Sequence, residues 1–252
     1  MSKIILIYSD LDSLYEYFYN DAKKEKSLLP IPKERECTVR AIDLSFVIEN
    51  KMPGFPGDPD AEIRDLSTVA EAGCAMKSIF ITTHIGTHID APAHMIEGGK
   101  TLDDFPLEKF FGSAVVLDVR DQAGGEISSE RLGGAEDLPG VDFLLLYSGW
   151  DEKFGTDGFF RDFPVLSEEA ARAIGRSKIK GVGIDVLSFD PVDSPTFPIH
   201  KILLATETLL IENLRGLGRL PFNRPFQFAA MPLPVKKADG APARAAAFLD
   251  ER

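Results

Sequence analysis

Cysteine is scarce in this sequence of 252 residues. Only Cys37 and Cys74 occur, and their spacing matches no metal-binding motif. Two cysteines in a chain of this size do not make a disulfide-rich secreted scaffold, and they are typical of proteins from a reducing compartment. We therefore expect the protein to reside in the cytoplasm.

The sequence also lacks long apolar runs and an excess of positive charge. Runs such as Leu144–Leu146 are far too short to span a bilayer. Ile4–Ile7 is too short for the core of a signal peptide, and Asp10 and Asp12 follow it closely. The net charge is −12, whereas proteins that bind nucleic acid are usually basic. We expect a small-molecule substrate and neither a membrane nor a nucleic acid as partner.

Histidine is rare as well, and its placement is informative. Of the four histidines, three lie at His84, His88 and His94, and the fourth is His200, which Glu212 follows after two apolar runs. Histidine is the commonest protein metal ligand. The clustering therefore indicates a metal site built from two halves of the sequence.

The spacing of the first half favours a strand. The β-branched and aromatic segment 77–83 is typical of a strand, and side chains on a strand alternate between its two faces. His84, His88 and Asp90 would then share one face, with Gly86 leaving room for an ion between the imidazoles. Gly86 and Pro92 also imply a bend, so that this alternation is only approximate.

The second half is less specific. The apolar runs 202–204 and 209–211 are consistent with a buried turn and a strand, and Glu212 ends the second run. Glu207 lies close by and is a rival candidate ligand. His84, His88 and Asp90 alone would leave open coordination positions, as catalytic sites do.

Three kinds of protein fit these ligands. The first is a metal-dependent hydrolase, in which the ion activates water and polarises a carbonyl group. The second is a non-haem iron oxygenase, whose triad is two histidines and a carboxylate. The third is a metal-holding binding protein without turnover. An oxygenase of this kind would not need His200 and Glu212 as ligands. A metal-holding binding protein would not need His94 as an acid/base residue.

The elements beyond the histidine motif indicate an α/β protein. Strands are predicted at 114–119, 141–147 and 181–186, with a helix over 167–174 that Ser167 caps. A strand, a helix and a strand in succession suggest a βαβ unit. Gly181 and Gly183 do not have the spacing of a phosphate-binding loop.

Several segments together resemble the cyclase family, whose best-known members are bacterial kynurenine formamidases. The segment His84–His94 matches the family motif H-x-G-T-H-x-D-x-P-x-H. Further matching blocks follow the family order, at 42–45, 52–58, 147–150, 182–188, 229–234 and 239–244. The chain therefore divides into an N-terminal arm, residues 1–40, outside the resemblance, and a hydrolase domain, residues 41–252. We expect the arm to dock on its own core or on a partner chain.

The resemblance implies a ligand set. His84, His88 and Asp90 match the residues that hold a first metal ion, and Asp90, His200 and Glu212 match those around a second. One or two ions are implied, of zinc or of manganese. His94 matches the family's acid/base residue, although a role as a further ligand or in support of one stays open.

The resemblance also implies a fold, an assembly and a reaction. The fold is a swivelling β/β/α domain with a mixed sheet, which assembles as a homodimer or homotetramer. The reaction is hydrolysis of a C–N bond in an amide or cyclic amide, with N-formylkynurenine as one candidate substrate. Phe55 stands where the family often has a tryptophan that stacks on the substrate ring, so we expect Phe55 to contact substrate.

Overall fold

The structure, a computed structural model, describes residues 39–122 and 124–250. The predicted arm therefore lies outside the described residues, except for Val39 and Arg40, which begin the first strand. The strands are β1 (Val39–Asp43), β2 (Glu62–Ser67), β3 (Met76–Phe80), β4 (His88–Asp90), β5 (Phe111–Asp118), β6 (Glu126–Ile127), β7 (Phe143–Tyr147), β8 (Val165–Leu166), β9 (Gly181–Ile184), β10 (Leu209–Glu212), β11 (Phe226–Pro232) and β12 (Gly240–Asp250). The α-helices are α2 (Val69–Ala72), α3 (Ser129–Leu132), α4 (Glu168–Arg176) and α5 (Pro198–Leu204).

The main sheet is mixed and closes on itself. Its strand order is β1-β12-β11-β5-β7-β9-β10-β4, and β12 pairs with β4 as well. The neighbours among β5, β7, β9 and β10 run parallel, whereas β1, β4, β11 and β12 pair antiparallel. The second pairing of β12 makes a barrel-like core, with β1 attached to β12. This α/β architecture with a mixed sheet confirms the predicted fold class.

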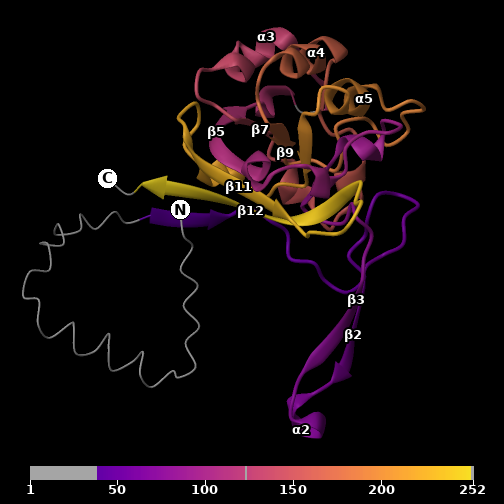
Figure 1. Cartoon of the computed structure of the whole chain (residues 1–252). Coiled ribbons are helices and arrows are strands. Elements are labelled where there is room, and N and C mark those ends of the chain that lie inside the picture. The colour runs from indigo at the N-terminus through magenta and orange to yellow at the C-terminus, as the bar shows by residue number, and fades with distance from the viewer. Residues whose placement is uncertain (1–38, 123, 251–252) are drawn as a thin grey trace, which may run out of the picture. The chain divides into compact units, whose positions relative to one another are not determined.

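Both faces of the central strands are buried, each in a different core. On β5, Val116 packs inside the barrel, whereas Val115 packs under the helices. On β7, Leu145 packs inside the barrel and Leu144 packs under the helices. Side chains alternate between the faces of a strand, so a strand buried on both faces appears in the sequence as an unbroken apolar run. Figure 1 shows α3, α4 and α5 together on one side of β5, β7 and β9.

The predicted βαβ unit is present as β7, α4 and β9. The two strands pair in parallel, and Ser167 caps α4 by accepting a hydrogen bond from the backbone N–H of Ala170 at 3.1 Å. Glu168 and Glu169 occupy the first turn, where acidic side chains favour the positive end of the helix dipole. These local signals placed the start of the helix correctly.

One hairpin extends away from the barrel. β2 and β3 form a separate two-stranded sheet with α2 at its tip (Figure 1). The adjacent residues Ile79 and Phe80 point to opposite faces, yet they are 62% and 56% exposed. The hairpin is therefore uncovered on both faces.

No helix in the described part of the chain is long and apolar enough to cross a membrane.

Candidate metal centre

Two neighbouring strands bring the first candidate ligands together. β4 pairs antiparallel with β10, so that Asp90 lies opposite Leu210 and His88 lies opposite Glu212. Ile89 points into the barrel core, whereas Leu210 belongs to the core under the helices. Because side chains alternate along a strand, His88, Asp90 and Glu212 share the face on the helix side of the barrel. All three are buried.

His84 reaches this face by a different route from the predicted one. β3 ends at Phe80, and residues 83–87 form a turn and bends instead of continuing the strand to 90. The prediction that positions 84, 86, 88 and 90 lie on one strand face is therefore wrong for 84 and 86. Gly86 has φ +58°, in the left-handed region that favours glycine. The reversal at Gly86 still brings His84 Nδ1 to 2.7 Å from an Asp90 oxygen.

Gly86 also has a role that differs from leaving space for an ion. Its carbonyl oxygen lies 2.8 Å from His88 Nδ1 and accepts a hydrogen bond from Asn213 Nδ2 at 3.1 Å. Asn213 directly follows Glu212, and its carbonyl accepts a bond from the Thr87 hydroxyl at 2.5 Å. These contacts join the turn before β4 to the end of β10. They leave His88 Nε2 facing the carboxylates.

Helix α5 supplies His200. The run 202–204, expected to form a buried turn, is the end of this helix, which begins at Pro198. Asp190 accepts bonds from the backbone N–H groups of Ile199 and His200 at 3.0 and 2.9 Å, and lies 2.6 Å from His200 Nδ1. Carboxylates commonly hold the outer ring nitrogen of a metal-bound histidine in this way. His200 Nε2 is thereby directed at Glu212, 3.1 Å away.

The spacing of these atoms fits metal coordination. Two ligand atoms about 2.1 Å from a tetrahedral ion lie about 3.4 Å apart. His88 Nε2 is 3.3 Å from an oxygen of Asp90 and 3.3 Å from one of Glu212, and His200 Nε2 is 3.6 Å from Asp90. His88 Nε2 and Asp90 Oδ2 are buried without a hydrogen-bond partner. Buried orphaned atoms of this kind fit a donor set for a cation.

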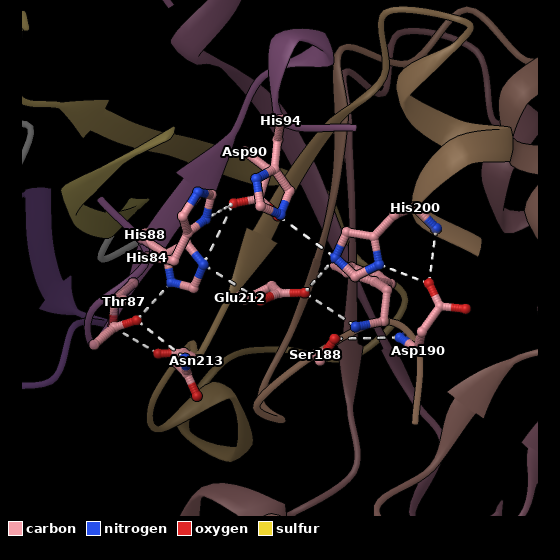
Figure 2. A network of polar contacts seen from close by, with 12 residues as sticks. His84, Thr87, His88, Asp90, His94, Ser188, Asp190, His200, Glu212 and Asn213 are labelled. Atoms are coloured by element: carbon pink, nitrogen blue, oxygen red, sulfur yellow. Dashed lines mark hydrogen bonds and ion pairs between the residues drawn. The ribbon is translucent and has the colours of Figure 1, made fainter. Parts of the chain in front are cut away.

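Three groups of described side chains could hold an ion: one is His84, His94 and Asp239, and the other two share the Asp90 carboxylate. His84, His88 and Asp90 make one group, and Asp90, His200 and Glu212 make the other. Figure 2 shows the histidine rings converging on the two carboxylates. Imidazole nitrogen and carboxylate oxygen are ligands for divalent transition metals. The chain thus presents groups able to hold a divalent ion.

The charged groups of the cluster shift one another's pKa values. Burial alone would lower the pKa of His84, but Asp90 and Asp239 raise it to about 9. Burial likewise opposes the charge of His88, yet Asp90 and Glu212 raise its pKa to about 10. Against the cost of burial, the two histidines hold the pKa of Asp90 well below its usual range. Protons thus balance the carboxylates, and an ion that replaces them releases those protons.

His94 lies beside the cluster, at the end of a short 3₁₀ helix, Pro92–His94. Its ring centroid is 4.0 Å from that of His84 and 6.1 Å from that of His200. Burial lowers the pKa of His94, and the two neighbouring histidines lower it further against the opposing effect of Asp90. A neutral imidazole at neutral pH is able to accept a proton.

A pocket of about 280 Å³ opens onto these residues. Phe55 lines it, and the Phe55 ring lies 6.3 Å from that of Phe197. Met95 and Leu187 add further apolar wall. The pocket therefore combines an apolar wall with the polar cluster, as small-molecule sites usually do.

Some of the surrounding residues were not predicted. Asp190 and Phe197 had no distinguishing signal, because each acts through contacts within the fold. Asp239 belongs to a segment that carried the family resemblance, but its spacing indicates no role. Conversely, the rival Glu207 is exposed and pairs with Lys100 at 2.8 Å, away from the ligand groups.

The chain belongs to the cyclase family. The family model described as "Putative cyclase" matches residues 42–191. A kynurenine formamidase of Geobacillus thermodenitrificans is 33% identical over 207 residues, which cover 81% of this chain and 95% of that protein. The kynurenine formamidase of Sphingopyxis alaskensis is 29% identical over 82% of this chain and 96% of its own length.

Solved structures agree with this placement. A potential metal-dependent hydrolase with cyclase activity has a TM-score of 0.71 and 28% identity, covering 85% of this chain and 100% of its own. An isatin hydrolase bound to the product analogue thioisatinate has a TM-score of 0.75 at 20% identity, covering 97% of this chain and 100% of its own. The latter likeness concerns the fold alone.

Proposed function

We propose that this protein is a metal-dependent hydrolase that cleaves the C–N bond of an amide or cyclic amide. One observation carries the proposal: two ligand groups share Asp90, and both Asp90 and His88 keep a buried atom without a hydrogen-bond partner beside His94 and an apolar pocket. The 33% identical relative is named as a kynurenine formamidase, which is consistent with this chemistry.

The residues divide the work. Five residues would hold one or two divalent ions: His84, His88, Asp90, His200 and Glu212. An ion there supplies a Lewis acid that generates a nucleophile from water at neutral pH and polarises a carbonyl oxygen.

His94 would serve as the acid/base residue. It would accept the proton of the attacking water and then donate it to the leaving nitrogen, a role worth about 10²–10⁴-fold in rate. Its lowered pKa supports the first step, because the neutral ring is the form that accepts a proton.

Zinc is the ion we propose, with manganese as the alternative. Imidazole suits zinc, and carboxylate ligands suit both metals. Elemental analysis of protein purified without added metal would identify the ion and its number per chain. Iron as the ion required for activity would contradict this assignment.

The substrate we propose first is an N-formyl aryl amide such as N-formylkynurenine. Phe55 and Phe197 offer aromatic faces on the pocket wall, and such faces bind aryl rings. The Phe55→Ala variant should raise KM for aryl amides far more than for aliphatic ones. An equal rise for both classes would remove Phe55 from the substrate site.

A substrate panel tests the function directly. N-formylkynurenine, an isatin-like lactam and small aliphatic amides would be assayed with metal-loaded protein, with chelated protein and after Zn²⁺ or Mn²⁺ is restored. Hydrolysis that disappears on chelation and returns with metal is the expected result. Full activity without metal, or none towards any amide, would refute the proposal.

The oxygenase and the non-catalytic binder fit the site less well. In an oxygenase His200 and Glu212 would be surplus, yet both lie within the same buried cluster as His88. A binder has no need of a histidine with a lowered pKa beside the ligands. The panel separates these alternatives as well.

We also propose a homodimer or homotetramer. The β2–β3 hairpin exposes Leu66, Val69, Met76, Ile79 and Phe80. A lone two-stranded hairpin is marginally stable in water, and exposed apolar patches often mark interfaces. Light scattering should show a smaller particle for the Ile79→Lys variant than for a control at exposed Leu107, Leu107→Ser. An unchanged size would exclude this hairpin as the interface.

The cytoplasm remains the location that we propose. Cys74 is exposed and free, which suits a reducing compartment. Fractionation of the native host would test this, and recovery outside the cytoplasm would contradict it.

A further inference from the structure

Asp239 joins two histidines of different proposed roles. Its Oδ2 atom lies 2.9 Å from His84 Nε2 and 3.3 Å from His94 Nδ1. His84 is a proposed metal ligand and His94 the proposed acid/base residue. One carboxylate oxygen therefore touches the outer nitrogen of both rings.

The surrounding backbone holds Asp239 in this place. Its carbonyl oxygen accepts a hydrogen bond from the Ala91 N–H at 2.8 Å, directly after the ligand Asp90. The next residue, Gly240, begins β12 and pairs with Asp90 across the strands. The carboxylate is thus built into the same strand register as the ligand.

Gly240 shows how closely this segment approaches the ligand ring. A Cβ atom at Gly240 would lie 2.6 Å from His84 Cε1 and 3.0 Å from the Ile89 carbonyl oxygen. Only glycine leaves room for the His84 ring between β12 and β4. The Asp239–Gly240 pair therefore fits the ring by both hydrogen bonding and shape.

The orientation of each ring follows from these contacts. Asp239 contacts Nε2 of His84, so the opposite ring nitrogen, Nδ1, is directed at the ligand group. His84 Nδ1 lies 2.7 Å from Asp90. His94 meets Asp239 through Nδ1, so a proton held on Nδ1 leaves Nε2 as the free base. A partner on one ring nitrogen determines which nitrogen is available on the other side.

We propose that Asp239 is a positioning residue that sets the orientation and tautomer of both His84 and His94. The part of this proposal that concerns turnover rests on the hydrolase function proposed above. The part that concerns the rings does not, because it applies to the folded protein whether or not it hydrolyses an amide. Asp239 itself is not proposed to touch the substrate or to hold the metal.

Nitrogen NMR of the full chain with ¹⁵N-labelled histidine tests the ring orientation. The chain has four histidines, so single His→Gln variants assign every ring. With Zn²⁺ bound, Asp239→Asn should change the ring-nitrogen shifts of His84 and His94 and leave those of His88 and His200 in place. The control is Asp103→Asn, which removes an exposed carboxylate that accepts a hydrogen bond from the Lys237 N–H, two residues before Asp239. This control should leave the ring-nitrogen shifts of all four histidines unchanged. Unchanged signals for His94 in Asp239→Asn would overturn the proposal.

A double-mutant cycle tests the effect on turnover. At saturating Zn²⁺, Asp239→Asn should lower kcat by about 10–100-fold with little change in KM, the usual cost of losing a partner of a site histidine. In a His94→Gln background the same change should cost much less, because residues that act through one another are not additive. A full penalty in that background would show that Asp239 does not act through His94.

A matched pair at the same position separates charge from size. Asp239→Glu keeps a carboxylate within reach of the rings and should recover part of the lost kcat, whereas Asp239→Gln should not. Equal activity for the two would mean that the negative charge of Asp239 is unimportant. If no amide is hydrolysed by the unaltered protein, the NMR result alone decides the positioning role.

Discussion

At the scale of single residues, the site depends on which carboxylates face inward. Asp90 and Glu212 are buried with His88 and His200, whereas Glu207 is exposed and pairs with Lys100. A buried carboxylate is costly unless it is paired or binds a metal. The neighbouring glutamates on this segment should therefore behave very differently when they are changed.

Glu212→Ala should reduce metal occupancy, because it removes an oxygen 3.3 Å from His88 Nε2 and 3.1 Å from His200 Nε2. Glu207→Ala is the matched control and should leave the bound metal unchanged. Elemental analysis after dialysis against a fixed free concentration of Zn²⁺ measures both. The reverse order would rule out the second ligand group.

A further buried carboxylate, that of Asp185, should make stability depend on pH. Burial raises the pKa of Asp185 to about 7, even though N–H groups of Ser148 and Gly149 hydrogen-bond to it. The unfolded pKa is about 3.9, so between roughly pH 4 and 7 the folded state holds a proton that the unfolded state has lost. The contribution of Asp185 to stability therefore falls as pH rises through this window.

Urea unfolding of the unaltered protein and of Asp185→Asn isolates this contribution. The free energy of unfolding of the unaltered protein, relative to the variant, should decrease from pH 4 to pH 7 and level off above it. The difference removes the effects of the other titrating groups. A difference that rises with pH would mean that the folded-state pKa is not raised.

The sequence predicts some of these residues better than others. That His88 and Asp90 share one face follows from the period of two along a strand, and β4 confirms it. The approach of His84 depends on a turn at Gly86, which that period does not describe. Asp239 was missed because the histidines that it touches are 155 and 145 residues away in the sequence, and Asp190 was missed because no local pattern shows its contact with His200, ten residues further on.

At the scale of elements, β9 illustrates tight packing of the sheet. Gly183 lies between β7 and β10 in this strand. A Cβ atom there would lie 2.6 Å from Leu214 Cδ1 and 2.8 Å from Leu145 Cδ2. The two glycines of β9, which do not form a phosphate loop, thus belong to the packed core.

Gly183→Ala should destabilise the protein by about 1–3 kcal/mol, the usual cost of overpacking a core. Gly158→Ala is a suitable control, because its added Cβ would meet only Thr156 Oγ1 at 3.6 Å. Chemical denaturation compares the two variants. Equal stability of both would show that the side chains around β9 move aside at no cost.

Elements with local signals were predictable and those with distant partners were not. The apolar run of β7 and the cap at Ser167 identify a strand and a helix from a few residues. Helix α5 follows Phe197, which has a left-handed φ of +48° and makes no side-chain cap, so Pro198 in its first turn is the local sign of its start. The closure of the sheet by β12 and β4 joins strands far apart in the chain, and no local pattern encodes it.

At the scale of the whole molecule, the ligand groups connect β4, α5 and β10. An ion bound there would hold these elements together in the folded state and would find no such preformed site in the unfolded chain. Binding to the folded state alone stabilises it, by about 2.7 kcal/mol when free ligand is 100 times the Kd. Metal content should therefore determine thermal stability as well as activity.

Removal of metal with a chelator should lower Tm, and added Zn²⁺ should restore it in a concentration-dependent way. His88→Ala, which lacks a central ligand, should show a much smaller response to both treatments. Differential scanning calorimetry measures the shift. An equal response in the variant would place the stabilising ion elsewhere.

The distance along the chain between the two sides of the site has a consequence for protein synthesis. His84 and Asp239 are 155 residues apart, and β4 pairs with β10 and β12, both of which are made much later. While the ribosome is still producing the middle of the chain, β4 has neither neighbour and His84 has no Asp239. A nascent chain thus cannot assemble the centre from its early histidines alone. The complete centre, with Asp239 beside His84, therefore forms only near the end of translation or after release, when the last strand closes the barrel.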